Sequence, residues 1–112
     1  MNVNPTLLKL ETKTGLPVYP DTKRGQAEEY ITFNYADERD VLFGDDKPIE
    51  ESADMQVHVF VKETTDYMDV KKIIKQYLVD IGACGISSTC NYEDETKKRH
   101  LIFEFEISEE RS

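Results

Sequence analysis

The chain has 112 residues, a formal net charge of −9 and 38% hydrophobic residues, which is enough apolar material for one folded core. This composition excludes a disordered segment, and no apolar run approaches the ~20 residues needed to cross a bilayer. Residues 1–13 lack a basic segment followed by an apolar stretch, so we expect no secretory signal there. The two cysteines, Cys84 and Cys90, suit a reducing cytoplasm better than a disulfide framework. We therefore expect one cytoplasmic domain over residues 1–112.

The negative charge is unevenly spread along the sequence. Residues 37–54 hold eight acidic residues against two basic ones, Arg39 and Lys47, a net −6. Such a surface argues against binding of a phosphate backbone, which needs clustered Lys and Arg. It allows a basic protein partner, a surface that repels nucleic acid, or a solvated loop that only aids solubility. The acidic residues that we take as candidates for an interface are Asp37, Glu38, Asp40, Asp45, Asp46, Glu50 and Glu51.

The start of the chain predicts a short helix followed by an extended segment. Asn4 before Pro5 is typical of a helix start, and Gly15 of a helix end, so we expect a helix over residues 5–14. The two prolines of residues 16–20 favour extended backbone.

Alternation of apolar and polar side chains predicts the first two full strands, over residues 30–35 and 55–62. We expect the acidic segment between them, residues 37–51, to form a short edge strand and loop, or a flap. Phe60 falls on the polar phase of the second strand, which should face away from the helices. It could lie under a loop on the far side of the sheet, or pack against another subunit.

The second half of the chain predicts a helix and a hairpin. Asp66 is a candidate N-cap with Asp69 in capping-box position, and apolar residues at a spacing of three to four continue to Gly82. Two strands, about residues 83–92 and 99–107, then form a hairpin with a polar turn. We expect residues 108–112 to fray.

These elements predict an α+β fold with a mainly antiparallel sheet and two helices packed on one face. The apolar positions expected to share the buried side are Ile31, Phe33, Tyr35, Val57, Val59, Ile73, Ile74, Tyr77, Leu101, Phe103 and Phe105.

The sequence predicts no catalytic, cofactor-binding or metal site. Cys84 and Cys90 would lie roughly 20 Å apart in an unbroken strand, too far for a disulfide and outside metal-ligand spacing, so we expect two small half-buried residues. His58 and His100 have no Cys or carboxylate cluster at ligand spacing, so a metal or general-base role would require distant strands to converge. The glycines form no phosphate loop, and the acidic segment fails the calcium-loop pattern. We expect a protein that is not an enzyme.

A basic triplet, Lys97, Lys98 and Arg99, lies beside the last predicted turn. It is either a solvated corner or the complement of an acidic neighbour.

The order of several short strings resembles the small tail-terminator or tail-completion proteins of long-tailed phages and prophages. These strings are Gly15-Leu16-Pro17-Val18-Tyr19, Glu29-Tyr30-Ile31-Thr32-Phe33, Gln56-Val57-His58-Val59-Phe60 and Leu101-Ile102-Phe103-Glu104-Phe105, together with a helix ending at Gly82 and a hairpin tip at Asp94 to Lys97. The match spans nearly the whole chain, but it is a pattern of elements without a catalytic signature.

The resemblance implies a homo-oligomeric ring, typically of six copies, that caps the head-proximal end of the tail tube and prepares head–tail joining. Its partners would be further copies of the chain, tail-tube proteins and head-side connector proteins, with no cofactor and no membrane. The protein would pass from the host cytoplasm into the tail or neck of the virion. A ring lined by carboxylates would repel DNA from its wall, so that DNA passes without specific binding.

Two other classes of protein fit the same sequence. An acidic inhibitor, of the immunity or DNA-mimic type, would offer its carboxylates to a basic partner without forming a ring. A regulatory module would bind a small ligand in a pocket that the sequence does not reveal.

Overall fold

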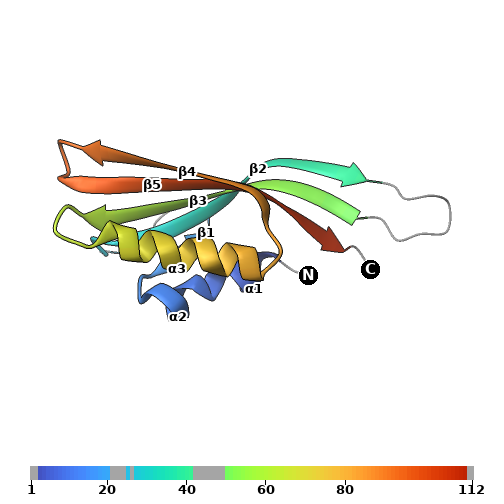
Figure 1. The fold of residues 1–112 in the computed structure, drawn as a ribbon, viewed down its shortest axis with the longest axis horizontal. Helices are drawn as coiled ribbons and strands as arrows, with labels where there is room; N and C mark the ends of the chain where they lie inside the picture. Colours follow the sequence, from blue (N-terminus) through green and yellow to red (C-terminus); the bar gives the residue numbers. More distant parts are fainter. Residues whose placement is uncertain (1–2, 21–24, 26, 42–49, 111–112) are drawn as a thin grey trace.

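The computed structural model describes residues 3–20, 25, 27–41 and 50–110, with side chains described for residues 5–20, 25, 27–36 and 53–107. In this part of the chain the five strands form one sheet in the order β1-β2-β3-β5-β4. The first pair, β1 and β2, is parallel and the other pairs are antiparallel, with the helices on one side (Figure 1). The predicted α+β fold is confirmed. The elements in chain order are α1 (Val3–Leu8), α2 (Leu10–Thr14), β1 (Val18–Pro20), β2 (Tyr30–Val41), β3 (Glu50–Lys62), α3 (Tyr67–Asp80), β4 (Cys84–Glu93) and β5 (Lys98–Glu110).

The register of the central strands places apolar residues in rows on the helix side. Val57 of β3 is paired with Phe33 of β2 and with Phe103 of β5. Directly paired residues share a face of the sheet, so these three side chains form one continuous row. All three are at most 2% exposed, because the helices cover this face. The alternation seen in the sequence therefore identifies the buried side correctly.

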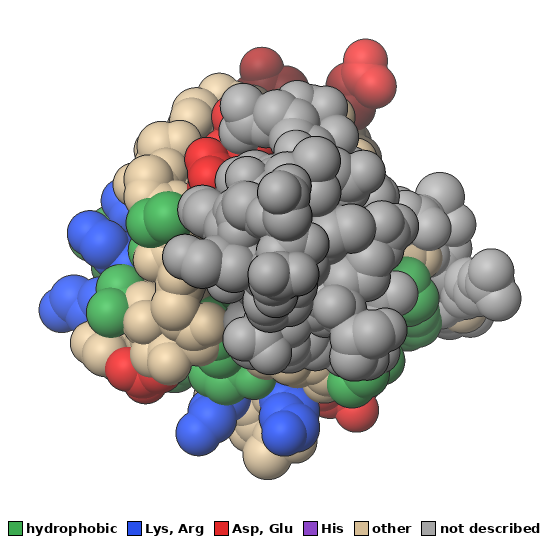
Figure 2. All heavy atoms as spheres, turned by 90° about the vertical axis from the view of Figure 1, so that its right-hand side faces the viewer, with side chains coloured by type: hydrophobic (Ala, Val, Ile, Leu, Met, Phe, Trp, Pro, Cys, Tyr) green, Lys and Arg blue, Asp and Glu red, His purple; other side chains and the backbone are tan. Residues whose placement is uncertain are grey.

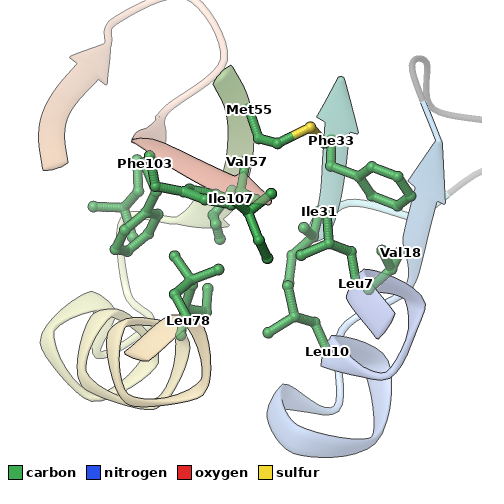
Figure 3. Close-up of a cluster of buried hydrophobic side chains, with 14 of the residues drawn as sticks. Leu7, Leu10, Val18, Ile31, Phe33, Met55, Val57, Leu78, Phe103 and Ile107 are labelled. Atoms are coloured by element: carbon green, nitrogen blue, oxygen red, sulfur yellow. The ribbon is translucent and has the colours of Figure 1, made fainter. Parts of the chain in front are cut away.

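Leucines from the helices complete the core (Figure 3). Leu7 of α1 and Leu10 of α2 lie beside Ile31 and Val18, and Leu78 of α3 lies on the other side of the cluster. Eight of the eleven predicted core residues are buried, while Tyr35 and Tyr77 pack at its margin and Ile73 lies outside the cluster. The buried hydrophobic residues are Leu7, Leu10, Val18, Ile31, Phe33, Ala53, Met55, Val57, Val59, Val61, Ile74, Leu78, Leu101, Phe103, Phe105 and Ile107.

The N-terminal helix differs from the prediction of one helix over residues 5–14. It begins earlier, at Val3, and is divided at Lys9 into α1 and α2. The amide of Lys9 donates to the carbonyl of Thr6 (3.3 Å), an i to i−3 bond that tightens the turn. Gly15 ends α2 in the left-handed conformation (φ 77°), as its position in the sequence predicts.

In the described parts of the acidic segment 37–51, extensions of two neighbouring strands stand in place of the expected edge strand or flap, and residues 42–49 lie outside the described residues. Residues 37–41 continue β2, and residues 50 and 51 begin β3. The pairing of β2 with β3 shifts register between Tyr35 and Asp37 and then continues. The two strands are therefore longer than the alternation of apolar residues in the sequence indicates. Strand β5 similarly continues to Glu110, past the point where we expected fraying to begin.

The helix α3 and the last hairpin agree with the prediction. The Asp66 carboxylate accepts a hydrogen bond from the amide of Asp69 (3.4 Å), and Gly82 follows the helix with a φ of 92°. Cys84 and Cys90 are free and exposed, contrary to the expectation of half-burial, because β4 is the edge strand of the sheet.

Candidate interaction surfaces

The face of the sheet opposite the helices carries a row of stacked rings. Tyr30, Phe60 and His100 are paired with one another across β2, β3 and β5. Neighbouring strands lie about 4.8 Å apart, which is also a favourable spacing for stacked rings. The Tyr30 and Phe60 ring centroids are 4.7 Å apart, and those of Phe60 and His100 are 4.2 Å apart. Tyr19 of β1 extends the row with an edge contact to Tyr30 (6.4 Å).

A chain of polar contacts crosses the same face beside the stacked rings. His58 Nδ1 lies 2.9 Å from His100 Nε2, and His58 Nε2 lies 3.2 Å from the Gln56 side-chain oxygen. Asn34 Nδ2 donates to that same oxygen (3.5 Å). At the other end, His100 Nδ1 lies 4.0 Å from a Glu93 carboxylate oxygen. The chain of contacts therefore connects four strands, β2, β3, β5 and β4.

The contacts of the histidine pair determine where its protons reside. Because the Gln56 oxygen is an acceptor, His58 Nε2 donates to it, and in the neutral tautomer His58 Nδ1 is then free to accept from His100 Nε2. Burial lowers the pKa of both histidines, although Glu104 opposes the shift at His58 and Glu93 opposes it at His100. The nearby His58 further lowers the pKa of His100. Both shifts favour the uncharged form of the two rings at neutral pH.

In the sequence, a metal or general-base role for His58 and His100 would require distant strands to converge. The structure does bring the two side chains together, from β3 and β5. The alternation of residues along the two strands places both histidines on the outward face, which the sequence alone could have shown. His58 and Phe60 share the outward phase of β3, and His100 is on the outward phase of β5. The antiparallel register that places Phe60 opposite His100 brings His58 to the diagonal position.

The acidic candidates concentrate at one end of the sheet. Asp37, Glu38 and Asp40 lie in the last part of β2, and Glu50 and Glu51 begin β3, whereas Asp45 and Asp46 lie outside the described residues. The register pairs Asp40 with Glu51 and Glu51 with Glu109, so three strands contribute acidic residues at one level. The contribution of β5 to this acidic end is a feature that the sequence did not reveal.

The basic triplet does not form one patch. Lys97 is exposed in the turn with a φ of 58°, and the Lys98 ammonium lies 5.8 Å from the Tyr30 ring centroid on the outward face. Arg99 is on the opposite face, because successive residues of a strand alternate. Its guanidinium lies 4.7 Å from the Tyr67 ring centroid and 5.8 Å from the Tyr92 ring centroid. Arg99 therefore serves contacts within the chain.

No group of three or more His, Cys, Asp or Glu side chains that could hold a metal ion occurs among the residues that the structure describes. No helix in the described ranges is long and apolar enough to span a membrane. The surfaces with distinctive chemistry in this part of the chain are a row of half-exposed rings, a histidine pair and an acidic end.

Comparison with known proteins gives a likeness in fold. No protein-family model matches the sequence, and no curated protein matches it either. Among solved structures, a chain from the virion of a native gene transfer agent (GTA) particle has a similar fold, with a TM-score of 0.59. The two chains are 16% identical, and the aligned region covers 91% of this chain and 84% of that chain. This likeness extends over nearly all of the α+β fold.

Proposed function

We propose that this chain is a non-enzymatic structural protein of a phage or phage-like particle, which acts as a homo-oligomeric ring at the head-proximal end of the tail tube. The observation that carries this proposal is the whole-chain likeness in fold to a chain of the GTA virion. The resemblance of its short sequence strings to tail-terminator proteins supports this place in the particle. Six copies would form the ring, which would stop tube growth and prepare head–tail joining.

The chain has surfaces that could contact other subunits in an assembly. A ring of more than two copies needs a head-to-tail interface in which two different patches meet. The acidic end of the sheet supplies one candidate patch, and the half-exposed aromatic row is a separate surface in another part of the sheet. The tail-tube and head-side proteins would contact the ring on its two sides. DNA would pass through the ring without specific binding, since each copy carries a net charge of −9 and repels phosphates.

Location in the particle tests this proposal. The gene would be given a short epitope tag in the phage or phage-like element that carries it, and purified particles would be labelled with gold-conjugated antibody. We expect gold at the junction of head and tail, and at one end only of free tails. Labelling along the tube or on the head shell would contradict the proposal, as would particles that lack the protein.

A further inference from the structure

We infer that a lysine-lined groove between α2 and α3 receives the acidic end of the sheet of a second copy of this chain. The inference rests on the proposed function, because it specifies the head-to-tail contact of the ring. The groove is a shallow hollow of about 640 Å³ on the helical layer, at the side of α3 that does not face the core. We call it the lysine groove. The lining residues that matter here are Lys13, Lys72, Lys75, Ile73, Tyr77 and Val79.

The floor of the lysine groove is apolar and open to solvent. Val79 is 52% exposed, and Ile73, which the helical period places with the core residues, lies outside the core cluster. The Tyr77 hydroxyl donates to the Thr6 carbonyl (2.6 Å), so its polar atom is satisfied within the chain. Exposed apolar side chains gathered in one hollow are typical of a surface that a partner covers.

The rim of the lysine groove is cationic and unneutralised. Lys13 comes from α2, and Lys72 and Lys75 lie one turn apart on α3. None of the three makes an ion pair within the described part of the chain. Asp80, the acidic residue of the lining, accepts a hydrogen bond from Gln76 instead (2.9 Å). Figure 2 shows Lys and Arg side chains along the lower and left-hand margins of the molecule, with hydrophobic side chains between them. The groove therefore suits a partner that is acidic and partly apolar.

The acidic end of the sheet is such a partner. Among residues 37–41, 50–54 and 106–110, which are paired with one another in β2, β3 and β5, nine are acidic and one, Arg39, is basic. Their net charge is −8, nearly all of the −9 carried by the chain. Cations brought by a neighbour would complement a surface with this net charge.

A chain cannot place its own acidic end in its own lysine groove. The acidic end is a continuation of the hydrogen-bonded strands β2, β3 and β5, which run past the ends of the helices (Figure 1). Returning it to the helical layer would require those strands to fold back and lose their ladder. The contact must therefore be made between two copies. Because the two surfaces differ, the contact can repeat head to tail from copy to copy, and a rotation can close it into a ring.

Disulfide trapping tests this contact even if free subunits associate weakly. Cys84 and Cys90, both free and exposed, are first replaced by Ser. One sample then carries Val79→Cys in the groove and the other carries Ser52→Cys at the acidic end, and the two are mixed at millimolar concentration and low salt with oxidised glutathione as the oxidant. We expect the 79–52 disulfide to form at least tenfold faster than the disulfide between Val79→Cys and Thr89→Cys on β4, which serves as the matched pair outside the contact.

Charge reversal decides whether electrostatics drives the trapping. Adding Lys72→Glu and Lys75→Glu to the Val79→Cys sample should slow disulfide formation at least tenfold. Adding Asp40→Lys and Glu51→Lys to the Ser52→Cys sample should then restore the rate. Lys97→Glu with Lys98→Glu, an equal change of charge at the hairpin, should have little effect.

Two results would overturn the inference: trapping no faster than with the control pair, or a rate that the reversal at Lys72 and Lys75 leaves unchanged. If the trap fails but particles still carry the protein at the tail end, this interface is wrong and the proposed function stands. Particles that assemble normally without the protein would instead reject the proposed function, whatever the trap shows.

Discussion

Two phenylalanines on opposite faces of the same sheet allow a matched test of the fold. Phe103 is fully buried against the helices in the middle of β5, while Phe60 of β3 is half-buried in the ring row on the other face. Replacing each with Ala removes the same atoms from neighbouring strands. The difference in the free energy of unfolding therefore measures how the two faces of the sheet are covered.

The structure sets the expected magnitudes. A fully buried Phe→Ala change costs about 3–5 kcal/mol, because transfer energy is lost and a cavity remains. Phe60→Ala loses partial burial and its stacking on Tyr30 and His100. At the low end of the roughly 0.5–1.5 kcal/mol that a stacked pair contributes beyond its area, as suits a half-exposed row, the two pairs contribute about 1 kcal/mol, so with the lost burial we expect a total of about 2 kcal/mol. A loss of ~3 kcal/mol should lower the Tm of a domain near this size by about 12 °C or more.

Urea denaturation followed by circular dichroism provides the assay, with the slope m checked for equality between variants. Phe103→Ala should show the larger loss by at least about 1 kcal/mol, given the two magnitudes above. Equal losses, or a larger loss for Phe60→Ala, would mean that the helices do not cover the face to which Phe103 is assigned.

Three further outcomes are expected of the isolated protein. Burial lowers the pKa of His58 and His100, so the unfolded chain binds more protons than the folded chain below about pH 6.5. The free energy of unfolding of the wild type should therefore fall more steeply from pH 7 to pH 5 than that of the double variant His58→Gln/His100→Gln. Equal slopes would contradict this. Asp66→Ala should cost about 1 kcal/mol through loss of the helix cap, whereas Asp94→Ala in the exposed turn should stay within about 0.5 kcal/mol; a negligible effect at Asp66 would contradict the cap. The Tm should be unchanged in chelator, and stoichiometric zinc or calcium whose removal unfolds the protein would show that a ligand set exists.

The sequence predicted the fold where a single periodic signal dominates. The alternation in residues 55–62 and 99–107 identifies the buried face of two central strands, and the spacing of three to four after Asp66 identifies α3. These signals work because burial against a helical layer requires one face of each element to be apolar. They are weaker in residues 37–41 and 50–54, where acidic residues interrupt the alternation and backbone pairing extends the strands further.

The sites depended on information that a linear sequence does not contain. The proximity of His58 and His100 follows from the register between β3 and β5, two strands that are neighbours in the sheet but not in the sequence. Lys97, Lys98 and Arg99 are adjacent in sequence but are separated by the strand alternation. Lys13 and Lys72 are far apart in sequence, but both line the groove because α2 packs beside α3. Ile73 has the helical spacing of the core residues of α3, yet it lines this groove and lies outside the core cluster.

Tail length in particles made without this protein tests the proposed function most directly. The gene would be deleted from the phage or phage-like element that carries it, and tails would be measured by electron microscopy, with expression from a plasmid as the control. A protein that caps the tube and prepares joining should leave over-long tails or tails without heads when it is missing, and the plasmid copy should restore normal particles. Joined particles with tails of normal length in the deletion strain would contradict the proposed function.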